Sequence, residues 1–186
     1  IFMKQKIFMA IAAAAMAMSV NAQTVYEGTK FTDNWYIGLN AGGVTPTTHS
    51  AFWGNMRFTG GLEFGKQVTP ILGLSFEAMT AINRTESATA FDGVRLMALG
   101  KFNLHNWFAG YQGEPRPFEI EAVGGIGWGH DIMNSGYFAW DYSYMASKFG
   151  LNFNFNLGES KAWTVSFKPA IVYRMDGHRA YLLNVN

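Results

Sequence analysis

The chain contains no cysteine, so its fold relies on no disulfide and no lipid anchor is attached through a thiol after the leader. Charge is also scarce, because Asp, Glu, Lys and Arg make up 15% of the residues, against about 25% in an average protein. Beyond the N-terminal segment no apolar run is long enough for a transmembrane helix, and no basic excess favours nucleic-acid binding. What is plentiful is aromatic side chains (16%) and 21 glycines. This balance indicates a sheet protein with a largely uncharged outer surface.

The N-terminus has the features of a secretory signal peptide. Two lysines follow Met3, the expected start, residues 7–20 form a short apolar stretch, and the triplet VNA at 20–22 resembles a cleavage site. We therefore expect residues 1–22 to be a signal peptide helix, with two leading residues left by read-through or a cloning scar. Its removal leaves 12 basic and 13 acidic residues in a single domain over 23–186. Export to the outer membrane of a Gram-negative cell is the expected localisation.

Apolar and polar residues alternate with a period of two along most of the remaining chain, which predicts β-strands. Moderately long polar connections alternate with shorter ones, as in up-and-down outer-membrane barrels. The connection at 105–117 is longer than this rule predicts, and no helical periodicity is evident there. Strands are predicted at 34–44, 57–68, 71–83, 94–104, 118–129, 143–157 and 163–174, with an eighth starting near Ala180.

One face of these strands is apolar, and Lys66 is its single charge. The other face is rich in Gly, Asn and Ser and carries scattered charges of both signs. A narrow barrel interior suits this face, because small residues make room and each buried charge needs a partner. The predicted fold class is therefore all-β, an eight-stranded antiparallel up-and-down transmembrane barrel. The predicted interior charges are Arg57, Glu63, Glu77, Arg95, Lys101, Glu119, Glu121, Lys148, Lys168 and Arg174.

These charges allow two interpretations. They form either a structural network that plugs the barrel or the constriction of a narrow porin-like channel for small solutes. The plugged interior is favoured, because eight strands enclose space for little more than side chains. Glu119 and Glu121 share a face, and we expect Arg95 and Lys101 on the preceding strand to balance them.

The tryptophans are placed near strand ends and not at strand centres. Two aromatic belts around an apolar band are typical of proteins that face a bilayer on their outside. One predicted belt contains Trp35, Trp107 and Trp163, and the other contains Trp53, Trp128 and Trp140.

Four segments carry a resemblance to a known family. They are "NAQTVYEGTKFTDNWYIGLNAGGVTPTTHSAF", "GLSFEAMTAIN", "FEIEAVGGIGWGHD" and "KFGLNFNFNLGESKAWTVSFKPAIVY". In them the chain resembles the OmpA-like N-terminal barrels of the Bacteroidetes outer-membrane group. The resemblance implies an eight-stranded barrel with a role in envelope integrity or surface interaction. It also implies the outer-membrane bilayer and the barrel-assembly machinery as partners, and no nucleic acid.

Two features depart from the family pattern. The chain ends at Asn186 just after the eighth strand begins, so we expect a truncated last strand and a domain that is incomplete at its C-terminus. Peptidoglycan binding, which many members perform through a further C-terminal domain, would depend on that missing part. Pro169 lies inside the seventh strand, where it removes a hydrogen-bond donor, and a local bulge is expected there.

An enzyme at the barrel rim is the third candidate class. His49, His130 and His178 all fall in the longer connections, close to aspartates. However, the adjacent His130 and Asp131 would point in opposite directions in a strand, and neither a G-x-S-x-G nor an H-E-x-x-H motif is present. We therefore predict no catalytic residue, no bound metal and no cofactor.

Overall fold

The protein is an all-β structure whose strands form one antiparallel, curled sheet. The computed structural model describes residues 31–46, 56–82, 91–132, 134–135, 138–139, 142–159, 163–175 and 181–185, so the signal peptide prediction lies outside the described residues. The large-sheet strands are β1 (Trp35–Pro46), β2 (Arg57–Gln67), β3 (Leu72–Ile82), β4 (Phe91–Asn103), β5 (Phe118–Asp131), β8 (Tyr142–Leu157), β9 (Trp163–Phe167), β10 (Pro169–Arg174) and β11 (Tyr181–Val185). The two-residue strands β6 (Asn134–Ser135) and β7 (Phe138–Ala139) form a separate small hairpin.

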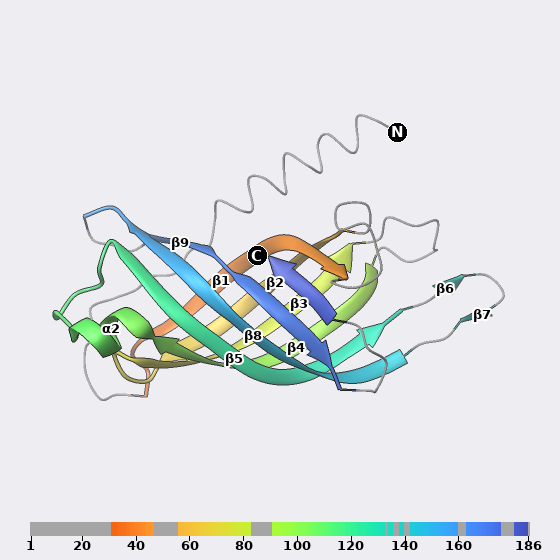
Figure 1. The fold of residues 1–186 in the computed structure, drawn as a ribbon, viewed down its shortest axis with the longest axis horizontal. Helices are drawn as coiled ribbons and strands as arrows, with labels where there is room; N and C mark the ends of the chain where they lie inside the picture. Colours follow the sequence, from red (N-terminus) through yellow and green to blue (C-terminus); the bar gives the residue numbers. More distant parts are fainter. Residues whose placement is uncertain are drawn as a thin grey trace.

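The pairing of the strands runs in a ring. Neighbours in sequence pair from β1 to β5, β5 pairs with β8, and β8 pairs with both β9 and β10. Strand β11 then pairs with β10 on one side and with β1 on the other. The sheet is therefore barrel-like, with the strands wrapped around a common interior (Figure 1).

Helix α2 (Leu104–Ala109) corrects the expectation that no helix would follow the leader. Its six residues are too few to show a helical period, but its start is well defined. Asn103 is the N-cap, and its side-chain oxygen accepts a hydrogen bond from the Asn106 backbone N–H at 3.0 Å. Asn106 in turn donates to the Pro70 carbonyl at 2.8 Å, which attaches the helix to the β2–β3 hairpin.

The expected bulge at Pro169 is wrong, and a bulge occurs elsewhere. Phe153 faces Phe167 and Gly150 faces Ala170, so β9 and β10 keep one continuous register with β8 across the proline. The strand is interrupted because proline has no N–H to donate, without an inserted residue. The register instead shifts between Ala81 and Ile82, where β4 has an additional residue.

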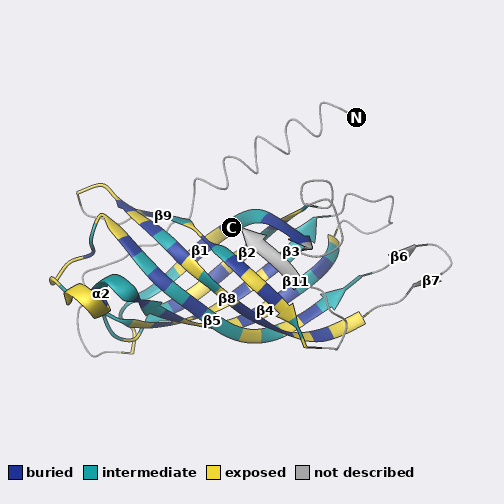
Figure 2. Ribbon diagram, in the orientation of Figure 1, coloured by how far each residue is buried: buried dark blue, intermediate teal, exposed yellow. Residues whose placement is uncertain are grey.

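Burial alternates along the strands in the pattern that the sequence predicted (Figure 2). In β3, for example, each residue from Leu72 to Met79 changes between exposed and buried. Phe76 is 69% exposed, whereas its neighbour Glu77 is 3% exposed. The apolar face therefore lies outside, and the polar face encloses the interior.

Two inward-facing glycines are covered by tyrosine rings from the neighbouring strand. Tyr36 lies opposite Gly65, and Tyr144 lies opposite Gly129. A Cβ atom added at either glycine would come within 2.3 Å of the ring. The missing side chains thus make room for the tyrosines in a strongly curved wall.

Candidate functional site

The interior of the barrel-like sheet is the candidate site. Two ends of the molecule serve as reference points: the hairpin end holds the β2–β3 connection and α2, and the loop end lies opposite (Figure 1). Eight of the ten predicted interior charges are buried: Glu63, Glu77, Arg95, Lys101, Glu119, Glu121, Lys148 and Lys168. The other two, Arg57 and Arg174, lie at the loop end, where their side chains are 50% and 14% exposed.

Glu63 is the centre of the main network. One carboxylate oxygen forms an ion pair with Lys101 and accepts a hydrogen bond from the Tyr36 hydroxyl at 2.9 Å. The second oxygen accepts from the Lys168 ammonium at 2.8 Å and from the Asn40 amide at 3.4 Å. These groups come from three strands and from the residue between β9 and β10, so the network crosses the interior.

A second ion pair adjoins the first. The Lys148 ammonium donates to both oxygens of Glu77, at 2.7 and 2.8 Å. The Asn40 amide group joins the two pairs, because its nitrogen lies 3.5 Å from Glu77 and its oxygen accepts from Lys168 at 2.9 Å. Sequence reasoning missed Tyr36 and Asn40, although both share the inward parity of the predicted charges.

Glu119 and Glu121 lie towards the hairpin end and have amide partners. Asn152 donates to Glu121 at 3.3 Å, and Asn156 donates to Glu119 at 3.5 Å. Lys101, which was expected to help balance this pair, forms its ion pair with Glu63 and also interacts electrostatically with Glu121. The neighbouring polar side chains are also hydrogen-bonded: Thr164 donates to Asn156 at 2.6 Å, and Ser166 donates to Asn154 at 2.7 Å.

The loop end contains two further ion pairs. Arg174 donates to Asp131 at 2.7 Å, and its guanidinium carbon lies 3.7 Å from the centroid of the Tyr144 ring. Arg57 donates to Asp92 at 2.9 Å. Asp92 is the additional residue of the β4 bulge, so the bulge supplies the partner of Arg57.

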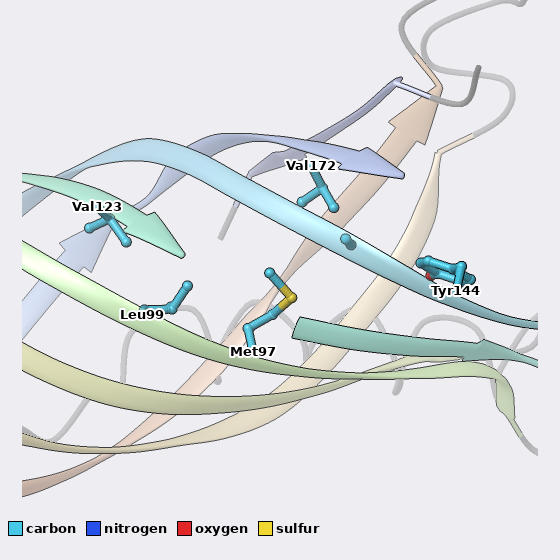
Figure 3. Close-up of a cluster of buried hydrophobic side chains, with 6 residues drawn as sticks. Met97, Leu99, Val123, Tyr144 and Val172 are labelled. Atoms are coloured by element: carbon cyan, nitrogen blue, oxygen red, sulfur yellow. The ribbon is translucent and has the colours of Figure 1, made fainter. Parts of the chain in front are cut away.

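An apolar cluster lies in the interior and shares strands β4 and β8 with Lys101 and Lys148, and the sequence pattern did not predict it (Figure 3). Its side chains project inward from β4, β5, β8 and β10 towards one another. The sequence did contain a signal for this cluster, because Val123 and Val172 occupy strand positions of the inward-facing set. The members are Met97, Leu99, Val123, Tyr144, Ala146 and Val172.

The outer wall at the loop end places a histidine beside a serine. The Nδ1 atom of His130 lies 2.9 Å from the Ser143 hydroxyl, and the Trp128 ring stacks on the imidazole with centroids 5.6 Å apart. The residue after this histidine, Asp131, contacts Arg174. His49 and His178 lie outside the described residues.

Of the described tryptophans, Trp35, Trp128 and Trp163 lie near strand ends, and Trp107 lies in α2. Trp107 and Trp163 are 56% and 53% exposed at the hairpin end, and Trp128 is 40% exposed towards the loop end. Trp35 stacks on Phe64 with ring centroids 4.8 Å apart. Trp53 and Trp140 lie outside the described residues.

Comparison with protein-family models, with curated proteins and with solved structures finds no match to this chain. Within the described ranges, no group of three or more His, Cys, Asp or Glu side chains is arranged to hold a metal ion. The same ranges contain no helix with the length and apolar character needed to cross a bilayer.

Proposed function

We propose that the chain is an outer-membrane β-barrel protein with a structural and surface-interaction role, and that its own side chains plug the interior. The observation that supports this proposal is that apolar side chains lie on the outside and charged side chains on the inside, the reverse of a water-soluble protein. Large apolar side chains are exposed along the outer wall, for example Leu74 at 61%, Phe76 at 69% and Phe149 at 63%. Proteins that dissolve in water rarely expose a continuous apolar surface of this kind. A bilayer would cover it, since a spanning strand presents its apolar residues to lipid.

The plugged interior is supported by two groups of side chains that occupy it, the buried ion pairs and the apolar cluster. Ion pairs around Glu63 and Glu77 connect opposite walls, and the apolar cluster occupies the space next to them. A permeating ion would have to break buried pairs or cross an apolar layer, and both steps are costly. Contact with other molecules would then take place outside the barrel and at its loops.

Electrophoresis of the folded chain tests the membrane proposal. Extracted from outer membranes in detergent, the protein should migrate differently on SDS gels before and after boiling, because a closed barrel resists SDS. A chain that remains monomeric and soluble without detergent would contradict the proposal.

A narrow porin-like channel is the second candidate, and the observation that favours it is the set of charges inside the barrel. Reconstitution in planar bilayers should give no stable single-channel current if the interior is plugged. A steady current that disappears in Arg95→Gln or Lys101→Gln would replace the plugged interior with a selective pore.

The hydrogen bond between His130 and Ser143 is the observation behind a third candidate, a rim enzyme. Hydrolysis of a lipid or peptide ester by the purified protein, lost in His130→Ala, would support it. We expect no such activity, because Asp131 contacts Arg174 and lies on the opposite face of the strand.

A further inference from the structure

A groove lies on the outer wall near the hairpin end. It has a volume of about 570 Å³ and crosses β3, β4, β5 and the middle of β8. Leu74, Gly100, Phe102, Gly124 and Phe149 are among the residues that line it, and a Cβ atom added at Gly124 would meet the Phe149 ring at 3.4 Å. A Cβ atom added at Gly100 would meet its nearest heavy atom at 3.7 Å, an ordinary contact, so the space above this glycine is open.

The strand register places five outward residues in one row, of which four line this groove and the fifth, Lys66, lies beyond it. Lys66 faces Leu74, Leu74 faces Gly100, Gly100 faces Gly124, and Gly124 faces Phe149. Four strand spacings of about 4.8 Å make the row roughly 19 Å long. It therefore begins at a cation and continues over two glycines to an exposed aromatic ring.

From Lys66 to Phe149, the residues of the row lie progressively farther from the hairpin end. Lys66 lies one residue before the end of β2, and Leu74 lies two residues after the start of β3. Gly124 lies six residues into β5, and Phe149 lies eight residues before the end of β8. The charged end of the row is thus at the rim, and the apolar end is at the middle of the wall.

The Lys66 ammonium is held at this rim. It donates to the backbone carbonyls of Phe31 and Asp33, each at 2.6 Å, and lies 5.1 Å from the Trp35 ring centroid. An ammonium group has three N–H donors, and these two carbonyls are its hydrogen-bond acceptors among the described residues. The third N–H has no acceptor among the described residues, and the ammonium also lies 5.3 Å from the Phe31 ring centroid.

We infer that this groove binds one acyl chain of an anionic phospholipid, whose phosphate lies beside Lys66. The inference rests on the proposed membrane function. A phospholipid has its charge at the membrane surface and its chains at depth, which matches the order of charge and apolar side chains along the row. The open space at Gly100 lets the chain approach the backbone, where it gains dispersion contacts that a flat wall does not offer.

Native mass spectrometry of the full chain in detergent micelles tests the inference, with phosphatidylglycerol as the probe. The wild type should retain one lipid molecule. Gly100→Leu fills the groove and should reduce the retained fraction about tenfold through lost packing, whereas Lys66→Gln should reduce it about fivefold through lost charge attraction. Gly60→Leu is the matched control, because Gly60 also faces outward with open space, its nearest contact being 3.9 Å, and lies outside the groove.

The possible outcomes separate the two proposals. Equal lipid retention by wild type, Gly100→Leu and Gly60→Leu overturns the groove assignment, while altered migration before and after boiling still supports the barrel. A chain that is soluble without detergent overturns both. A dimer that Gly100→Leu converts to monomer, with no retained lipid, assigns the groove to a second copy of the chain and also overturns the inference.

Discussion

Glu63 carries the largest share of the interior contacts, because two lysine ammonium groups and a tyrosine hydroxyl meet its carboxylate. The residue is 2% exposed, so water does not screen these interactions. Burying a charge is costly, and the cost is offset only while each charge keeps its partners. A single carboxylate therefore pairs with two buried cations, Lys101 and Lys168.

Glu63→Gln should destabilise the folded protein by about 3–5 kcal/mol, because it leaves two buried lysines facing a neutral amide. Urea unfolding followed by tryptophan fluorescence, with the protein in lipid vesicles, measures the change. Glu159→Gln is the control, since Glu159 is exposed in a turn, and a surface change of this kind should alter the free energy of unfolding by less than about 0.5 kcal/mol. Equal effects of the two substitutions would show that the Glu63 network contributes nothing to stability.

At the scale of elements, α2 is a short helix that depends on its contacts at both ends. Asn103 caps it, and Asn106 attaches it to the neighbouring hairpin. A helix of six residues is not stable by itself in water. Its stability must therefore come from these side chains and from packing, such as the contact of Trp107 with Phe102 at a centroid distance of 5.2 Å.

Asn103→Ala should remove the cap and lower the local stability of α2 by about 1 kcal/mol. Hydrogen exchange of the amides at 104–109 should then be about fivefold faster. The Asn103 side chain also hydrogen-bonds Glu119 on β5, so the strands expected to stay unchanged are β1 and β2. Asn103→Ser, which keeps a capping oxygen, should exchange at nearly the wild-type rate. If serine and alanine have the same effect, the cap does not hold the helix.

The elements also show what the sequence could predict. Strand positions followed from the period of two, and all the predicted ends lie within three residues of the observed ones, because burial on one face enforces that period. Helix α2 was missed because six residues span fewer than two turns. The bulge at Asp92 depends on how β3 and β4 are staggered, and the pairing of Lys101 with Glu63 depends on how β2 and β4 are placed around the interior, so the period of two predicts neither.

At the scale of the whole molecule, charged and apolar side chains are distributed in the opposite way to those of a water-soluble protein. Charged side chains such as Glu77 and Lys148 are buried and paired inside, whereas Phe76 and its outward neighbours are exposed. This reversal has opposite consequences in water and in a bilayer. Charge added to the outer wall would be harmless in water and costly in lipid.

The proposed membrane location therefore predicts a depth-dependent cost for charge on the outer wall. Phe76→Arg, near the middle of β3, should destabilise the protein in phosphatidylcholine vesicles by about 2–4 kcal/mol, and Leu157→Arg, the last residue of β8, by about 0–1 kcal/mol. Urea unfolding of both variants in the same vesicles measures the difference. In a water-soluble protein neither arginine would be penalised, because both positions are already exposed, at 69% and 49%. Equal stability of wild type and Phe76→Arg would therefore place the outer wall in water and contradict the membrane barrel.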